Sequence, residues 1–231
     1  MNKKLKISLA INILIVLMTI ASSIIMFTGF RFMTAYPVIL STTKFSMFRF
    51  FTVQSNLFAG IVSLIFVIKE IQILHGKKSE ISKRMHVLKL MSSTAVGLTF
   101  FVVFAYLGPI TPYGVPALLM NANLFFHLII PLVSIINFVC FERTNKLTFR
   151  NSFWGILPTA LYGVYYLTNV FIHMENGTVS PIYDWYYFVQ KGVWTAVIVV
   201  PIMLLITYII SLLIWRLNRP RRQLKGQESN V

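Results

Sequence analysis

Polar side chains that could do chemistry lie inside otherwise apolar stretches of this sequence. Thr52 and Asn56 are four residues apart, as are Asn123 and His127, so each pair would share one face of a helix. A threonine hydroxyl is a poor nucleophile until a base takes its proton, and an imidazole can take a proton near neutral pH. The two faces therefore carry the residue types of a nucleophile and its base. They fit plain packing equally well, because Asn, Thr and His side chains also bond across helices in lipid.

Other polar side chains are candidates for supporting roles. Asn56 or Gln54 could donate a hydrogen bond to an oxyanion, and Asn123 could orient the imidazole. Ser55, next to these residues, is a second hydroxyl that the sequence does not exclude as the nucleophile. A stripe at steps of three or four residues would line the interior: Tyr162, Tyr165, Tyr166, Asn169 and His173.

Asp184 is the only aspartate of the chain, and aromatic residues surround it in the segment 183–187. It would either cap a cavity from outside, or orient a donor such as Lys191. The alternative is a loop residue in the belt of aromatic side chains that membrane proteins place at the lipid–water interface.

The composition shows what kind of protein positions these residues. Of 231 residues, 57% are hydrophobic and 12% are charged, and the mean hydropathy is +0.75. Average soluble domains have about 45–50% apolar and about 25% charged residues. These values exclude a soluble globular enzyme and a disordered chain, and the single cysteine excludes a disulfide scaffold. The uncharged runs are 7–30, 51–68, 90–141, 151–174 and 192–215.

The lengths of these runs predict six membrane-spanning helices. A helix needs about 20 mostly apolar residues to cross the hydrocarbon core. The run 90–141 is too long for one helix, and its glycines and prolines between 108 and 116 mark a turn. A β-barrel would show short alternating segments instead. We therefore expect an all-α polytopic protein with a single domain, spans near 7–30, 48–69, 86–107, 118–141, 152–173 and 187–216, and a polar tail at 217–231.

The distribution of charge predicts the orientation. The net charge is +15, and seventeen of the 21 basic residues precede the first span, follow the last one, or lie next to the loops on that same side. Basic residues stay on the cytoplasmic side, so both termini should be cytoplasmic. Because the charge lies between spans, nucleic acid is not an expected partner. The Lys-, Ile-, Asn- and Phe-rich composition favours a bacterial plasma membrane.

Three segments together resemble a known family. They are FRFFTVQSNLFAG around 49–60, NLFFHLIIPLVSIINF at 123–138, and the tract ILPTALYGVYYLTNV followed by SPIYDWYYF at 180–188. In this order they resemble the androgen-induced protein family of intramembrane threonine hydrolases, and most closely its bacterial six-helix branch. The resemblance covers most of the chain and implies the same plan of six spans.

The resemblance implies a function. Animal members cleave esters between fatty acids and hydroxy fatty acids, and by position Thr52 matches the family threonine and His127 the family histidine. The animal pattern has Asn three residues after the threonine, whereas Asn56 follows Thr52 by four. We thus expect a hydrolase of lipid esters that needs no metal or cofactor, with membrane lipids and a fatty-acyl ester as its partners. A non-catalytic transporter of lipids or small molecules, or a structural membrane protein, is the alternative, and the oligomeric state stays open.

Overall fold

Six membrane-spanning helices make up the fold. The structure is a computed structural model that describes residues 2–37, 42–189 and 192–220. Within this part of the chain, six helices are long and apolar enough to cross a membrane, which confirms the prediction of an all-α multi-pass membrane protein. The spans are Lys3–Thr28, Phe51–Leu74, Lys83–Ile110, Ala122–Phe141, Phe149–Ile172 and Trp194–Asn218.

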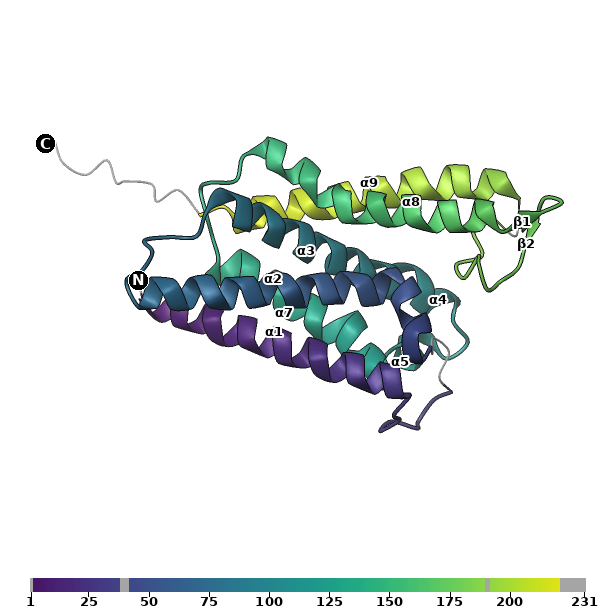
Figure 1. Ribbon diagram of the computed structural model, residues 1–231, viewed down its shortest axis with the longest axis horizontal. Coiled ribbons are helices and arrows are strands. Elements are labelled where there is room, and N and C mark those ends of the chain that lie inside the picture. Colours follow the sequence, from purple (N-terminus) through teal and green to yellow (C-terminus); the bar gives the residue numbers. More distant parts are fainter. Residues whose placement is uncertain (1, 38–41, 190–191, 221–231) are drawn as a thin grey trace, which may run out of the picture.

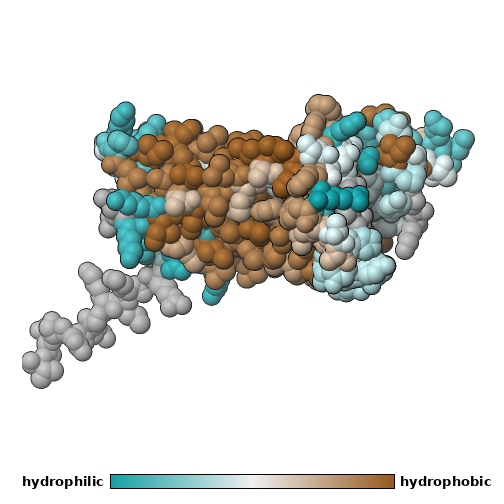
Figure 2. Space-filling model, turned by 90° about the horizontal axis from the view of Figure 1, so that it is seen from below, coloured by the Kyte–Doolittle hydropathy of each residue, from teal (hydrophilic) through white to brown (hydrophobic). Residues whose placement is uncertain are grey.

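The six helices run along one axis between two polar ends (Figure 1). We call one end the basic end; it holds the start of α1 (Asn2–Thr28), the loops 75–82 and 142–148, and the end of α9 (Val193–Asn218). The opposite end, with the segments 29–37, 42–50, 111–121 and 173–189, is called the aromatic end. On the face drawn in Figure 2, mostly hydrophobic residues cover the surface between the two ends, as expected for a surface in contact with lipid.

α3 (Lys83–Phe101) lies at the centre of the bundle. Within the third span, which α3 begins, 56% of the most apolar stretch is buried, compared with at most 39% for any other described span. α3 packs against α2 (Phe51–Leu74), α7 (Ile130–Ile136) and α9. The central position follows from its sequence, which is rich in Ser, Thr, Ala and Gly, because small side chains let neighbouring helices approach closely.

Irregular turns interrupt the third and fourth spans. The third continues from α3 through a π-helical segment, Val102–Leu107, into α4 (Gly108–Ile110). The fourth consists of α6 (Ala122–Leu124), a π-helical turn η3 (Phe125–Ile129), α7, and a second π-helical turn η4 (Asn137–Phe141). Single π-helical turns within α-helices are frequent at functional sites.

The fourth span begins at residue 122 rather than near 118. Between the third and fourth spans the chain forms the short helix α5 (Gly114–Leu118) and then a turn at Asn121, which has a φ of 56°. The Asn121 side chain accepts hydrogen bonds from the backbone N–H groups of Phe32 (2.7 Å) and Met33 (2.8 Å). It therefore ties the loop after α1 to the start of the fourth span.

The last two spans lie side by side in Figure 1. The fifth begins with a 3₁₀ segment η5 (Phe149–Ile156), capped by Thr148 and Asn151, and continues as α8 (Leu157–Ile172). At the aromatic end, β1 (Met174–Glu175) and β2 (Thr178–Val179) form a small antiparallel hairpin. α9 begins at Val193, six residues later than the sequence suggested. A further 3₁₀ segment, η1 (Lys44–Arg49), leads into α2.

Candidate functional site

The side chain of Asn56 joins the start of α2 to the fourth span. Its Nδ2 donates to the carbonyl oxygen of Thr52 (2.7 Å) and to that of Phe126 (3.0 Å). Since one nitrogen lies within hydrogen-bond distance of both oxygens, the turn of α2 that carries Thr52 is next to the π-helical turn that carries His127. The two turns that carry Thr52 and His127 are therefore neighbours in the bundle.

His127 is buried on η3, and one of its ring nitrogens is occupied. Its Nδ1 lies 2.7 Å from the carbonyl oxygen of Leu118, at the end of α5. A carbonyl only accepts, so Nδ1 carries the hydrogen and Nε2 is the acceptor of the neutral ring. No hydrogen bond among the described residues uses Nε2. The ring is thus in the tautomer that a general base needs.

Thr52 and Ser55 differ in how their hydroxyls are used. The Ser55 hydroxyl is buried, donates to the carbonyl of Thr52 (3.0 Å) and contacts Thr99 Oγ1 on α3 (3.1 Å). Thr52 is half-buried, and its hydroxyl makes no hydrogen bond with any described residue. Ser55 therefore serves the packing of α2 against α3, whereas the Thr52 hydroxyl has no hydrogen-bond partner among the described residues.

The Thr52 hydroxyl and the His127 ring do not bond to each other in the structure, and the supporting residues differ from those expected. Both hydrogens of the Asn56 amide are used on backbone carbonyls, so Asn56 positions the site and does not donate to an oxyanion. Its Oδ1 is buried without a partner. Gln54 donates to the carbonyl of Phe48 (2.7 Å). It follows Thr52 by two residues, and residues two apart on a helix do not face each other, so the Gln54 side chain points away from that of Thr52. Leu118, and not Asn123, provides the bond that orients Nδ1 of His127.

An aromatic cluster covers the start of α2, close to Thr52. The hydroxyl of Tyr162 donates to the carbonyl of Arg49 (2.6 Å), and the hydroxyl of Tyr186 accepts from the N–H of Phe51 (3.0 Å). Burial raises the pKa of Tyr186, so its hydroxyl stays neutral. The indole of Trp185 donates to the Tyr162 hydroxyl (3.0 Å). These contacts hold the loop before α9 over the aromatic end of α2.

The remaining predicted site residues serve this cover. Asp184 is fully buried; its carboxylate accepts from the Tyr166 hydroxyl and from the N–H groups of Phe188 (3.0 Å) and Val189 (3.1 Å). Asp184 is therefore a buried anchor of the loop, and Lys191, its suggested partner, lies outside the described residues. Two further members of the stripe on α8 also contact the cover: Asn169 donates to the carbonyl of Tyr183 (3.0 Å), and the ring of Tyr165, 46% exposed, contacts those of Tyr162 and Trp185.

Two hollows in the described part of the chain are relevant to these residues. One is at the aromatic end between the end of α1 and the start of the fourth span, where Gly29, Arg31, Asn121 and Asn123 line it. Another lies on the lipid-facing side of α8. Neither of these two hollows is lined by Thr52 or His127, and Asn123 is the predicted site residue that lines one of them.

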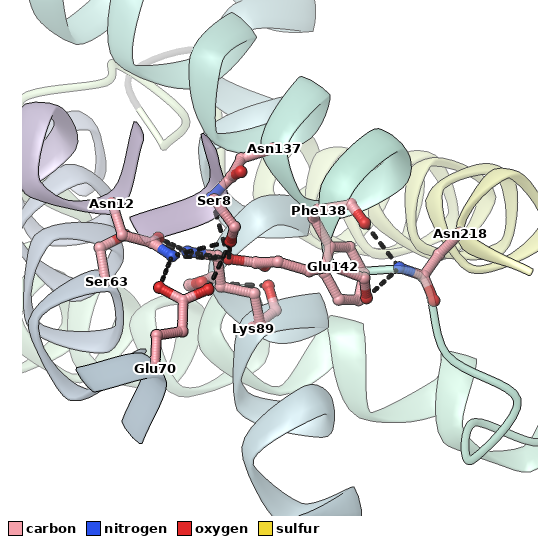
Figure 3. A network of polar contacts seen from close by, with 10 residues as sticks. Ser8, Asn12, Ser63, Glu70, Lys89, Asn137, Phe138, Glu142 and Asn218 are labelled. Carbon is pink, nitrogen blue, oxygen red and sulfur yellow. Dashed lines mark hydrogen bonds and ion pairs between the residues drawn. The ribbon is translucent and has the colours of Figure 1, made fainter. Parts of the chain in front are cut away.

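A second polar group, in the basic half of the bundle, was not predicted. Glu70, Lys89 and Glu142 are at most 5% exposed and lie together with Ser8 and Asn12 (Figure 3). Lys89 Nζ lies 3.5 Å from Glu142 Oε1. Glu70 lies within α2, which extends to residue 74 and not only to about 69 as predicted, Lys89 lies within α3, and Glu142 directly follows η4.

The burial of His86 within a span was not predicted either. This histidine is 6% exposed within α3, with its ring 5.9 Å from that of Phe66, so His127 is not the only histidine inside a span. The helical spacing gives a partial signal, because Glu70 and Ser63 are seven residues apart on α2, and His86 and Lys89 are three apart on α3. It places each pair on one helix face and does not show that the faces meet.

Comparison of the chain with protein-family models, with curated proteins and with solved structures finds no match. The function is therefore argued from the sites themselves.

Proposed function

We propose that this protein is an intramembrane hydrolase that cleaves a lipid ester, with Thr52 as nucleophile and His127 as base. The observation that carries the proposal is the Asn56 amide, which holds the Thr52 turn of α2 against the π-helical turn of His127. The acceptor nitrogen of His127 and the unbonded hydroxyl of Thr52 support it.

The reaction has two steps. His127 Nε2 takes the Thr52 hydroxyl proton as Oγ1 attacks the ester carbonyl carbon, and the same proton then goes to the departing alcohol. Water next attacks the acyl-threonine and gives a proton to Nε2. The bond between the acyl carbon and Oγ1 then breaks, the proton passes from Nε2 to Oγ1, and the fatty acid is released. In unliganded enzymes the bond between nucleophile and base is often completed only when substrate is present, in agreement with the absence of a bond between Thr52 and His127 here.

The position of Thr52 favours its role. It is the second residue of α2, and the partial positive charge at a helix N-terminus stabilises an alkoxide or an oxyanion. The aromatic cluster above it limits access of water, which strengthens electrostatic interactions within the site. Entry of an acyl chain from the lipid then requires no path through water.

The test is hydrolysis of a fluorogenic long-chain acyl ester by the protein in lipid vesicles. Thr52→Ala and His127→Gln should each lower the rate by about 10²-fold or more, since general base catalysis contributes about 10²–10⁴-fold. Thr111→Ala and His75→Gln, at the aromatic and basic ends, are matched controls that should hydrolyse normally. Equal activity of Thr52→Ala and wild type would refute the assignment, and loss of activity in Ser55→Ala alone would transfer the role to Ser55.

A transporter is the second candidate function, and the buried group of Glu70, Lys89 and Glu142 favours it. Ionisable residues inside a membrane domain often mark an ion or substrate pathway. A vesicle preparation that accumulates lipid or solute without cleaving any ester would support this candidate over the hydrolase.

A further inference from the structure

The buried polar group in the basic half links helices that are far apart in the sequence. It takes Ser8 and Asn12 from α1, Glu70 from α2, Lys89 from α3 and Glu142 from the end of η4 (Figure 3). These side chains are between 0% and 5% exposed. We call these five residues the buried charge network.

The two carboxylates of the network are neighbours. The hydroxyl of Ser8 lies 2.5 Å from Glu70 Oε1 and 3.2 Å from Glu142 Oε1. The amide of Asn12 donates to Glu70 Oε2 at 3.1 Å and to Glu142 Oε1 at 2.8 Å. Two carboxylates that share their donors in this way are rarely both ionised, because like charges at this separation repel each other.

One positive charge faces them. Lys89 Nζ is 2.5 Å from Asn12 Oδ1, 3.1 Å from Ser63 Oγ and 3.5 Å from Glu142 Oε1. Three acceptors around one nitrogen match the three N–H groups of an ammonium. With Lys89 charged and both carboxylates ionised, the network would keep one negative charge without compensation, which is costly away from water.

The atoms without partners are acceptors. Glu142 Oε1 has donors from Ser8, Asn12 and Asn137, the last at 2.9 Å, whereas Glu142 Oε2 is buried with none. Asn137, which is 0% exposed, likewise has a buried Oδ1 without a partner. The two oxygens without a donor, Glu142 Oε2 and Asn137 Oδ1, and the excess negative charge together favour binding of a small, positively charged ligand.

Other charged groups do not supply that charge. From α1 only neutral Ser8 and Asn12 face the carboxylates, and from α9 the amide of Asn218 donates to the carbonyl of Glu142 (3.1 Å). On α3, His86 packs on the Phe66 ring one turn before Lys89. In the loop 142–148, Lys146 pairs with the exposed Glu80 (2.6 Å). Arg143, exposed beside Glu142, bonds to the carbonyl of Val139.

We propose that Glu70 and Glu142 together bind one exchangeable proton, taken up from the basic end of the bundle. An O–H bond forms on one carboxylate oxygen when water at that end gives up a proton, and the proton returns to water on release. A metal ion is a poorer occupant, because two vacant oxygens are far fewer than the six or more that hard cations take. This proton site is independent of the hydrolase proposal.

The test uses the small number of acidic residues in the chain, six in all. Infrared spectra of the protein in lipid should show the C=O band of one protonated carboxyl per chain above pH 7, where exposed carboxylates, with pKa near 4, are ionised. The band should disappear in Glu70→Gln or Glu142→Gln and in the double variant. It should persist in Glu175→Gln, an exposed control.

The wild-type spectrum decides the question even if a variant fails to fold. Full ionisation of all six carboxyls at neutral pH would overturn the proposal. A band that survives in the folded double variant would assign the proton elsewhere, such as to Asp184, and would also overturn it. The band should be the same in sodium and in choline buffers; its loss on addition of sodium would show a metal ion as occupant and would contradict the proposal.

Discussion

The hydrogen bonds of Asn56 exclude one of the roles that an amide side chain could have at this site. From the sequence an amide near a nucleophile could donate to an oxyanion, but both of its N–H groups bond to backbone carbonyls in the structure. The helical spacing placed Thr52, Asn56 and His127 on polar faces, and the contact through Phe126 brings these faces together. The Leu118 bond to His127 could not have been predicted, because it depends on the turn at Asn121.

At this scale we predict that Thr52 and His127 act as one unit. The variant Thr52→Ala/His127→Gln should be hardly slower than either single variant, because without its base the Thr52 hydroxyl already contributes little to the rate. Rates of ester hydrolysis in vesicles, with expression and Tm as folding controls, measure this. Multiplicative losses would mean that the residues act separately.

A second residue-scale prediction concerns Lys89. Lys89→Met should lower the free energy of unfolding by about 3–5 kcal/mol, because it leaves a buried carboxylate without its cation. Lys146→Met removes the partner of an exposed carboxylate and should cost at most about 1 kcal/mol. Denaturant titration in detergent, followed by tryptophan fluorescence, compares the two. Equal effects would show that the burial of Lys89 has no energetic consequence.

The elements were predicted in number and type, and less well at their ends. Long apolar runs report helices reliably because the bilayer imposes their length. The π-helical turns leave no such pattern. The hairpin of β1 and β2 turns at Asn176-Gly177, both with positive φ, and this dipeptide is typical of two-residue hairpins.

At the scale of elements, close packing predicts the effect of two glycine substitutions. A Cβ on Gly155 would lie 2.1 Å from Ser211 Oγ on α9, whereas a Cβ on Gly163 in α8 would meet nothing within 4 Å. Gly155→Ala should therefore destabilise the protein by about 1–3 kcal/mol through overpacking. Gly163→Ala should be neutral or stabilising by up to about 1 kcal/mol. Thermal unfolding in detergent tests the pair, and a stable Gly155→Ala variant would contradict this packing of η5 on α9.

At the scale of the whole molecule, the described residues form a buried polar region near each end of the bundle. The aromatic-end region was predicted from the residues themselves. The basic-end network was not, because Glu70, Lys89 and Glu142 lie at the edges of apolar runs and look like loop charges in the sequence. Only the lengths of the folded helices bring them inside, and no periodicity in a single helix reveals contacts among several helices.

The orientation of the bundle is testable with one pair of cysteines. In a Cys140→Ser background, Thr178→Cys at the aromatic end should react with a membrane-impermeant maleimide added to intact cells, and Ser79→Cys at the basic end should not. The reason is that basic loops stay in the cytoplasm. Both positions are exposed, so permeabilised cells should label both. The reverse pattern in intact cells would invert the topology and place the Thr52 site in the cytoplasmic half.

The central claim, that Thr52 is the nucleophile, is tested most directly by mapping a covalent adduct. The protein in vesicles is treated with a long-chain fluorophosphonate, digested and analysed by mass spectrometry. We predict one adduct per chain, on the peptide that contains Thr52 and at its hydroxyl, with labelling abolished in Thr52→Ala and strongly slowed in His127→Gln. An adduct on Ser55 or another residue, or a folded wild-type protein that hydrolyses esters with Thr52 unmodified and dispensable, would contradict the claim.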